Sequence, residues 1–189
     1  MPPDSAATKK RLLDAAYAEF SEHGLAGARV DRIAERAQAN KRLIYVYFGN
    51  KDELFDLVVD QRVAAVVEAV PFTPDDLPGY AGAFFDFLVE HPDYLRLTTW
   101  RQFERPSPTA VELASYGDKV ERLRATRGGD TAIAPADLLA LVLSMTRAWL
   151  AASPALHAVA EPELRTTLVS HRGALVEAVR RIAAPTISA

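Results

Sequence analysis

The chain has 189 residues, 49% of them hydrophobic, so it can bury a sizeable core and is not disordered as a whole. It contains no cysteine, which excludes disulfide scaffolds, thiolate zinc sites and cysteine nucleophiles. Its first residues do not resemble a signal peptide, and no apolar run approaches the roughly 20 residues of a membrane span. We therefore expect a cytoplasmic protein without a membrane segment.

Charge is distributed unevenly along the sequence. The formal net charge is −3, yet residues 1–51 hold nine cations and six anions and so carry +3. The remaining residues then carry −6. A basic N-terminal part on an acidic body favours contact with nucleic acid, although a surplus of this size also fits an ordinary solvated helix surface.

Apolar residues recur at helical spacing throughout, and no strand-like alternation stands out, so we predict an all-α fold. In the first helix Thr8 is the expected N-cap, and Gly24 is the expected residue just beyond the end. The segment 71–74, with two prolines, marks the boundary between two parts of the chain. We predict about nine helices, over residues 9–23, 30–37, 41–48, 50–70, 78–90, 93–104, 109–127, 135–152 and 161–183.

The second and third helices are separated by three residues, 38–40, a spacing typical of a helix-turn-helix. The later helix of that motif enters the major groove of DNA, and Asn40 suits its N-cap. Its first turn holds Lys41, Arg42 and Leu43, of which the arginine can pair with guanine and the leucine can meet a thymine methyl. Hydroxyl and ammonium contacts to phosphates are expected from Tyr45, Tyr47 and Lys51.

The same features also fit two amphipathic helices of an ordinary bundle with basic polar faces. The restart of the chain after Gly49 favours the DNA interpretation. There Asn50 and Glu53 have the spacing of a capping box at the start of the fourth helix. The backbone amides of that helix start, together with Lys51, are placed to receive a phosphate.

Residues 8–60 resemble the DNA-binding domain of the tetracycline-repressor (TetR) family of transcriptional regulators. The resemblance rests on residues 15–20 with Gly24, on residues 30–34 and most strongly on residues 40–54. It implies a three-helix DNA-binding domain at 8–51, joined by the helix 50–70 to a C-terminal helical domain at 71–185. The family's C-terminal domain forms a homodimer and often binds a small effector.

The sequence departs from the family pattern in two places. Ala28 and Arg29 stand where the family usually has Ser or Thr before the second helix, so a side-chain cap worth about 1 kcal/mol is lost. Arg29 is placed to touch a phosphate instead. Arg42 and Leu43 stand where smaller residues are commoner, which indicates a distinct operator sequence. The residues expected to contact DNA are Arg29, Lys41, Arg42, Leu43, Tyr45, Tyr47 and Lys51.

In the C-terminal part, large apolar side chains recur on several helices. The resemblance implies that such residues line an effector cavity, while helical spacing alone fits a filled core equally well. The last two helices are rich in aliphatic residues, and the resemblance places the homodimer interface there; a central core helix of a monomer is the alternative. The candidate ligand-binding residues are Phe84, Phe87, Trp100, Phe103, Tyr116, Met145 and Trp149.

The four histidines lack carboxylates at metal-binding spacing, and no nucleophile motif or phosphate loop is present, so we expect no metal, no cofactor and no enzymatic activity. The sequence predicts a ligand-responsive transcriptional regulator, a repressor in the first instance. It binds a pseudo-palindromic double-stranded DNA operator as a homodimer and is released by a small apolar effector. The alternatives are a helical interaction module or a helical-bundle enzyme without a DNA role. The effector, the operator and the choice between repressor and activator stay open.

Overall fold

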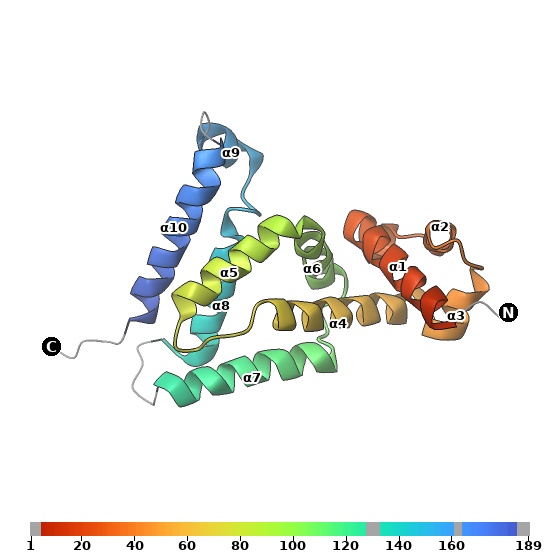
Figure 1. Cartoon of the computed structure of the whole chain (residues 1–189), viewed down its shortest axis with the longest axis horizontal. Coiled ribbons are helices and arrows are strands. Elements are labelled where there is room, and N and C mark those ends of the chain that lie inside the picture. Colours follow the sequence, from red (N-terminus) through yellow and green to blue (C-terminus); the bar gives the residue numbers. More distant parts are fainter. Residues whose placement is uncertain (1–4, 128–132, 161–163, 185–189) are drawn as a thin grey trace. The chain divides into compact units, whose positions relative to one another are not determined.

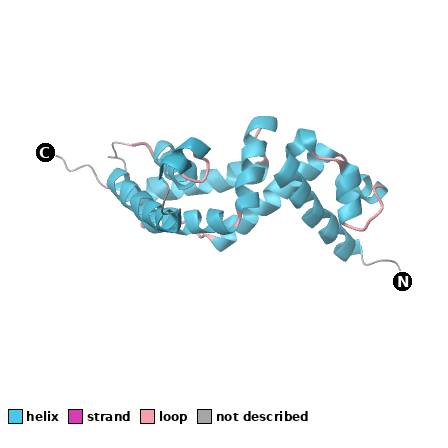
Figure 2. Ribbon diagram, turned by 90° about the horizontal axis from the view of Figure 1, so that it is seen from above, coloured by secondary structure: helices cyan, strands magenta, loops and turns pink. Residues whose placement is uncertain are grey.

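The computed structural model describes residues 5–127, 133–160 and 164–184. Every regular element in these ranges is an α-helix (Figure 2), so the predicted all-α class is confirmed. The described residues form ten helices, labelled in Figure 1. Their bounds are α1 (Ser5–Gly27), α2 (Val30–Arg36), α3 (Arg42–Phe48), α4 (Lys51–Ala69), α5 (Leu77–Glu90), α6 (Pro92–Glu104), α7 (Ala110–Arg127), α8 (Pro135–Ala148), α9 (Pro154–Ala160) and α10 (Leu164–Ala183).

About nine helices were predicted, and the short helix α9 is the additional one among the described residues. The prediction treats Ser153-Pro154 only as the end of a helix. Proline also fits the first turn of a new helix, because its missing N–H needs no partner there. Ser153 caps this turn, since its hydroxyl accepts the N–H of Leu156 at 3.2 Å. The predicted loop at 128–130 and the predicted helix start at 161 lie outside the described residues.

The first helix begins earlier than predicted and is broken where predicted. It starts at Ser5, so Thr8 is a buried residue inside the helix and not its N-cap. The preceding alanines are strong helix formers, which explains the extension. Gly24 has φ 68° and ψ −177°, a backbone conformation that interrupts the helix and favours glycine.

Helix α6 packs against this break in α1. A Cβ atom on Gly24 would lie 2.9 Å from the Trp100 ring and 2.9 Å from a carboxylate oxygen of Glu104, so both the close approach and the backbone require glycine. The Glu104 carboxylate accepts the N–H of Leu25 and, at 3.3 Å, that of Ala26. It thereby satisfies amides that the broken helix exposes.

The described residues divide into two compact units. Unit 1 combines residues 5–66 with 91–113, and unit 2 combines 67–90 with the described residues from 114 onward. This division differs from the sequence boundary at 71 because α6, which lies beyond that boundary, packs on α1 within unit 1. No local pattern announces that packing, since the contacting residues are about 80 positions apart in the chain.

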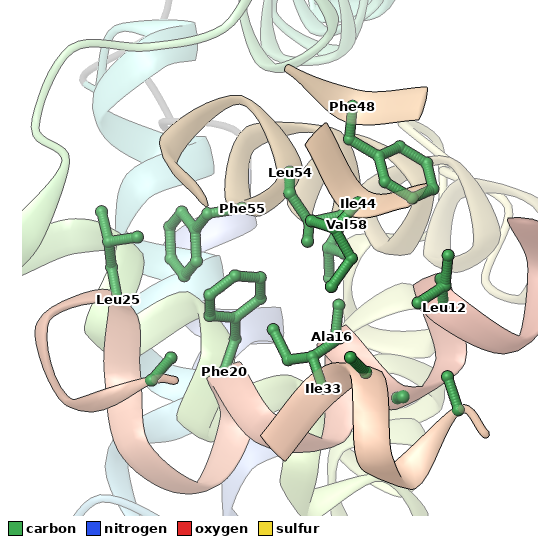
Figure 3. Packing of buried hydrophobic residues seen from close by; sticks show 14 of the residues in the cluster. Leu12, Ala16, Phe20, Leu25, Ile33, Ile44, Phe48, Leu54, Phe55 and Val58 are labelled. Carbon is green, nitrogen blue, oxygen red and sulfur yellow. The ribbon is translucent and has the colours of Figure 1, made fainter. Parts of the chain in front are cut away.

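Helices α1, α2, α3 and α4 meet around one cluster of buried side chains, which forms the core of unit 1 and is shown in Figure 3. Phe20 and Phe55 meet edge to face at its centre, with ring centroids 5.0 Å apart. Burial of such aromatic and aliphatic side chains is the main force that fixes α2 and α3 on α1. The labelled members are Leu12, Ala16, Phe20, Leu25, Ile33, Ile44, Phe48, Leu54, Phe55 and Val58.

In unit 2, α5, α8 and α10 pack against one another. Gly82 of α5 allows the close approach of α10, because a Cβ there would lie 2.9 Å from the guanidinium of Arg172. That guanidinium binds Asp86 through Nε at 2.8 and 2.9 Å. None of the helices in the described residues combines the length and the apolar character that crossing a membrane requires.

Candidate nucleic-acid interface

Helix α3 is held with one face in the core and the opposite face outward. Ile44 and Phe48, four residues apart, are buried in the unit 1 cluster, as Figure 3 shows. The turn before α3 closes through Ala39, whose N–H donates to the carbonyl of Ala34 at 3.0 Å. Gln38 in this turn has φ 49°, a left-handed conformation that lets the chain reverse over three residues. The predicted helix-turn-helix geometry therefore forms.

The two residues predicted as caps beside α3 both make side-chain hydrogen bonds to the backbone, although α3 begins one residue later than predicted, with Lys41 at its N-cap position. The side-chain oxygen of Asn40 accepts the N–H of Arg42 at 2.8 Å. At the start of α4, Asn50 Oδ1 accepts the N–H of Glu53 at 2.9 Å, and Glu53 Oε2 accepts the N–H of Asn50 at 3.1 Å. This reciprocal pair is the predicted capping box, and it fixes where the chain turns from α3 into α4.

The outward face of α3 carries a row of three side chains at positions i, i+3 and i+4. Arg42 and Tyr45 are exposed, and 64% of Val46 is exposed. Leu43 and Tyr47 lie at the border, half-buried and packed against the core cluster. The sequence prediction omitted Val46, although the helical period that places Ile44 and Phe48 inward already places Val46 outward.

Helix α2 begins without a side-chain cap, as the sequence predicted at Arg29. A distant carboxylate compensates: Glu19 of α1, of which only 1% is exposed, accepts the N–H of Arg29 at 2.8 Å and Nε of Arg32 at 2.7 Å. Burial by itself raises the pKa of Glu19, but these hydrogen bonds outweigh it and hold the pKa below its ordinary value. Glu19 thus locks the start of α2 onto α1.

The cations predicted to contact DNA differ in their present partners. Lys41 Nζ lies 2.8 Å from Asp31 Oδ1 of α2, and this hydrogen bond raises the pKa of Lys41 and lowers that of Asp31. Lys51 Nζ donates to the carbonyl of Ala28 at 3.2 Å. Within the described part of the chain, the guanidinium groups of Arg29 and Arg42 make no hydrogen bond or ion pair. These two exposed cations are available to a phosphate or a base edge.

The Asp31–Lys41 pair occupies the ammonium predicted to contact a DNA phosphate, so Asp31→Asn is expected to tighten binding to operator and random duplexes alike. We expect about a fivefold gain in affinity and a salt slope steeper by about one, because Lys41 then releases a counterion on binding. Fluorescence anisotropy over a salt series measures both. Glu35→Gln, on the same helix and with the same charge change, is the control. If Glu35→Gln tightened binding equally, the gain would come from the change in net charge and not from loss of the Asp31–Lys41 pair.

The seven candidate ligand-binding residues fall in both units. Trp100 and Phe103 belong to α6 of unit 1, and 75% of Phe103 is exposed. In unit 2, Phe84 is buried and stacks on the half-buried Phe87, with ring centroids 6.4 Å apart. Trp149 stacks on His171 at 5.0 Å. Tyr116 on α7 is half exposed, and Met145 on α8 is half-buried.

A groove of about 210 Å³ lies in unit 2 between α5 and α10 and includes none of these seven residues. Its lining residues are Phe85, Asp86, Val89, Glu90, Leu168, Val169 and Arg172. Among the residues that the structure describes, no group of three or more His, Asp or Glu side chains is arranged to hold a metal ion.

Two family profiles match the sequence. The profile described as "Bacterial regulatory proteins, tetR family" matches residues 12–58, and "Tetracyclin repressor-like, C-terminal domain" matches residues 76–181. The first covers α2, α3 and most of α1 with the beginning of α4, and the second covers α5 to almost the end of α10.

Individual relatives match either nearly the whole chain or part of it. The HTH-type transcriptional repressor SCO4008 of Streptomyces coelicolor is 39% identical over 184 residues, which are 94% of this chain and 91% of the relative. The crystal structure of the transcriptional regulator SCO4942 of the same organism has a TM-score of 0.81 at 38% identity and covers 93% of this chain and 97% of that one. The HTH-type transcriptional activator FasR of Mycolicibacterium smegmatis is 39% identical over 112 residues, 56% of this chain and 49% of that protein.

Proposed function

The chain belongs to the TetR family and is a DNA-binding transcriptional regulator; from this premise we propose that it is a homodimeric repressor that a small effector releases from a pseudo-palindromic operator. The observation that carries the DNA part is the outward row Arg42, Tyr45 and Val46 on a helix whose other face is fixed in the core. A rigidly seated helix with a guanidinium, a phenol and an exposed valine is suited to base edges in a major groove.

We assign base recognition to Arg42 and Val46 of the outward row, and phosphate contacts to the tyrosines and the cations around them. Arg42 is suited to pair with a guanine. Val46 replaces Leu43 as the side chain facing a thymine methyl, because Leu43 packs partly into the core. Tyr47 is similarly half-buried, which leaves its hydroxyl as a phosphate donor at the helix edge. The proposed phosphate contacts are Arg29, Lys41, Tyr45, Tyr47 and Lys51.

The dimer is proposed to form through α8 and α10, the predicted last two helices, with α9 now between them. Apolar side chains remain exposed on these three helices in the single chain: Leu141 on α8, Leu156 and Val159 on α9, and Val169 on α10. Val159 and Val169 are 84% and 76% exposed. Apolar groups clustered on adjacent elements favour a protein interface. A C2 dimer would present two α3 helices to two operator half-sites.

Effector release requires that the effector bind the DNA-free state more tightly than the DNA-bound state. The aromatic side chains of unit 2 are the proposed apolar part of its site, among them the stacked pair Phe84 and Phe87, and Tyr116. One of the relatives above is a repressor and another is an activator. Whether this protein represses or activates is tested by measuring transcription from a promoter that carries the operator, with and without the protein.

The experiment for DNA recognition is an electrophoretic shift with the DNA upstream of the gene and with random duplex. We expect Arg42→Ala to reduce operator affinity about 10- to 100-fold and random binding little, since it removes a base contact. We expect Arg29→Ala to weaken both duplexes and to reduce the salt slope by about one, since it removes a phosphate contact. Lys10→Ala, whose ammonium pairs with Asp14, is the control.

No shift of any duplex by the wild-type protein would refute the proposed operator binding and favour a helical interaction module. Equal losses on operator and random duplex in the Arg42→Ala protein would refute the assignment of base recognition to Arg42. The retarded complex is expected to contain two chains per operator, as a mass measurement of the complex would show.

A further inference from the structure

Unit 2 buries a lysine that has no carboxylate partner. Only 8% of Lys119, on α7, is exposed. Its ammonium donates to Ser115 Oγ at 2.6 Å and to the Ser115 carbonyl at 3.3 Å, both one helical turn back. The other buried charged residues of the described chain, Glu19 and Arg101, each bind an oppositely charged side chain. Among the described residues, Lys119 is therefore the one buried charge without a counter-ion.

The charges nearest to Lys119 do not neutralise it. Asp118 precedes it on α7, but its carboxylate lies 3.5 Å from Arg122, and the two act on Lys119 with opposite sign. The Tyr116 ring centroid is 5.7 Å from the ammonium. This cation–π contact offsets only part of the positive charge and does not provide a counter-ion. Burial consequently lowers the pKa of Lys119. A buried cation with so little compensation is costly to keep.

Lys119 occupies a position where the helix would ordinarily place an apolar residue. Leu123, one turn further along the same face, is completely buried. The same helix is fastened to the segment before α5, whose Phe72 contacts an aromatic side chain of α5. Arg122 donates to the carbonyl of Phe72 at 2.7 Å, and the Phe72 ring meets Tyr80 at 4.9 Å.

Tyr116 links Lys119 to this aromatic group, because its ring centroid is 5.7 Å from the ammonium and it contributes to the raised pKa of Tyr80. Tyr80 stacks on Phe84 at 6.0 Å, and Phe84 stacks in turn on Phe87. Burial raises the pKa of Tyr80 to about 12, with a further contribution from Tyr116, so the Tyr80 phenol stays neutral and does not serve as a counter-ion. One buried ammonium is therefore linked through Tyr116 to a set of aromatic rings, an arrangement suited to an apolar molecule that ends in an anionic group.

We propose that Lys119 is the anchor of the effector site in unit 2 and that the effector is an apolar carboxylic acid bound as its carboxylate. This inference rests on the proposed effector response and adds the chemical class of the effector. An ammonium has three donors, and Ser115 supplies acceptors for two, so one donor remains for a carboxylate oxygen. The bound anion supplies the missing counter-ion, whereas a neutral amide of the same shape does not.

The test compares acids with their neutral amides on the full-length protein. Decanoate against decanamide and 4-phenylbutanoate against 4-phenylbutanamide are titrated by calorimetry and followed by thermal unfolding. We expect at least one acid to bind the wild-type protein about tenfold more tightly than its amide, a typical gain for a charge-assisted hydrogen bond. Lys119→Met should reduce this preference to about twofold or less. Lys119→Arg, which keeps the charge, should retain it, and the exposed Lys10→Met serves as the control.

The outcomes separate this proposal from the proposed regulator function. The unliganded Lys119→Met protein should still shift the operator, and the preferred acid should release operator from the wild-type protein but not from the variant. If no acid is preferred over its amide, or if Lys119→Met keeps the preference, the anchor role of Lys119 is wrong even when operator binding is intact. Loss of the preference in Lys119→Arg as well as Lys119→Met, with both variants folded, would also contradict a role based on charge.

Discussion

Glu19→Ala is expected to lower the free energy of unfolding by about 2 to 3 kcal/mol, because it removes a buried acceptor from two donors at once. The Arg29 N–H at the start of α2 loses its only acceptor in the described structure, and Arg32 loses its buried partner. Urea denaturation measures the change. Glu22→Ala is the matched control, since Glu22 is exposed on the same helix and its contacts to His23 and Arg36 are 3.8 Å long; we expect it to cost less than about 0.5 kcal/mol.

The same carboxylate makes stability depend on pH in a defined direction. The folded-state pKa of Glu19 lies below its unfolded value, so the stabilisation is complete above the unfolded pKa of 4.5 and is lost as pH falls through the lower folded pKa. Glu19→Gln should therefore flatten the acid side of the stability profile. An unchanged slope below this pH in the Gln variant, or a Glu22→Ala cost as large as that of Glu19→Ala, would contradict the assignment.

The parts of the fold that were predictable depend on residues close together in the sequence. The capping box of Asn50 and Glu53 spans four residues, and the cap of Asn40 acts on the second residue after it. The inward pair Ile44 and Phe48 follows from the helical period alone. Such signals operate within about one turn, so they are legible without the tertiary structure.

The features that were missed depend on residues far apart in the sequence. Glu19 replaces the absent cap of α2 from ten residues away, and Glu104 of α6 binds amides beside Gly24 from 78 and 79 residues away. Neither carboxylate differs in sequence from an ordinary surface glutamate. Lys119 was missed for the same reason, because only the packing of unit 2 shows that its ammonium is buried.

These contacts connect the fold to the proposed function through α2. Glu19 and Phe20 are neighbours on α1: Glu19 fixes the start of α2, and the Phe20–Phe55 contact fixes the beginning of α4. Helix α3 stands between those two elements in the chain, so its outward row is oriented by contacts that none of its own side chains makes. Loss of either contact is expected to impair DNA binding without removing a single DNA contact.

Glu112→Ala is expected to cost about 3 kcal/mol of stability, because it leaves the guanidinium of Arg101 buried without a counter-ion. The Arg101 side chain is 6% exposed and binds Glu112 Oε2 at 2.8 Å. Its Nε and Nη1 atoms already lack partners, and the carbonyl of Ser107 would be the remaining acceptor. The pair joins α6 to the first turn of α7 within unit 1, so the loss should appear in the urea midpoint of the intact protein.

Replacing Arg101 instead of Glu112 is expected to lower the stability much less. Arg101→Met removes the buried charge and keeps an apolar side chain of similar length, while Glu112 still accepts the N–H of Thr109 at 2.8 Å. We expect the free energy of unfolding to change by less than about 1 kcal/mol, in either direction. Combining both substitutions should restore much of the stability that Glu112→Ala loses, because no unpaired cation remains. Equal costs for the two single variants, or additive costs in the double variant, would show that the unpaired Arg101 charge is not what makes Glu112 necessary.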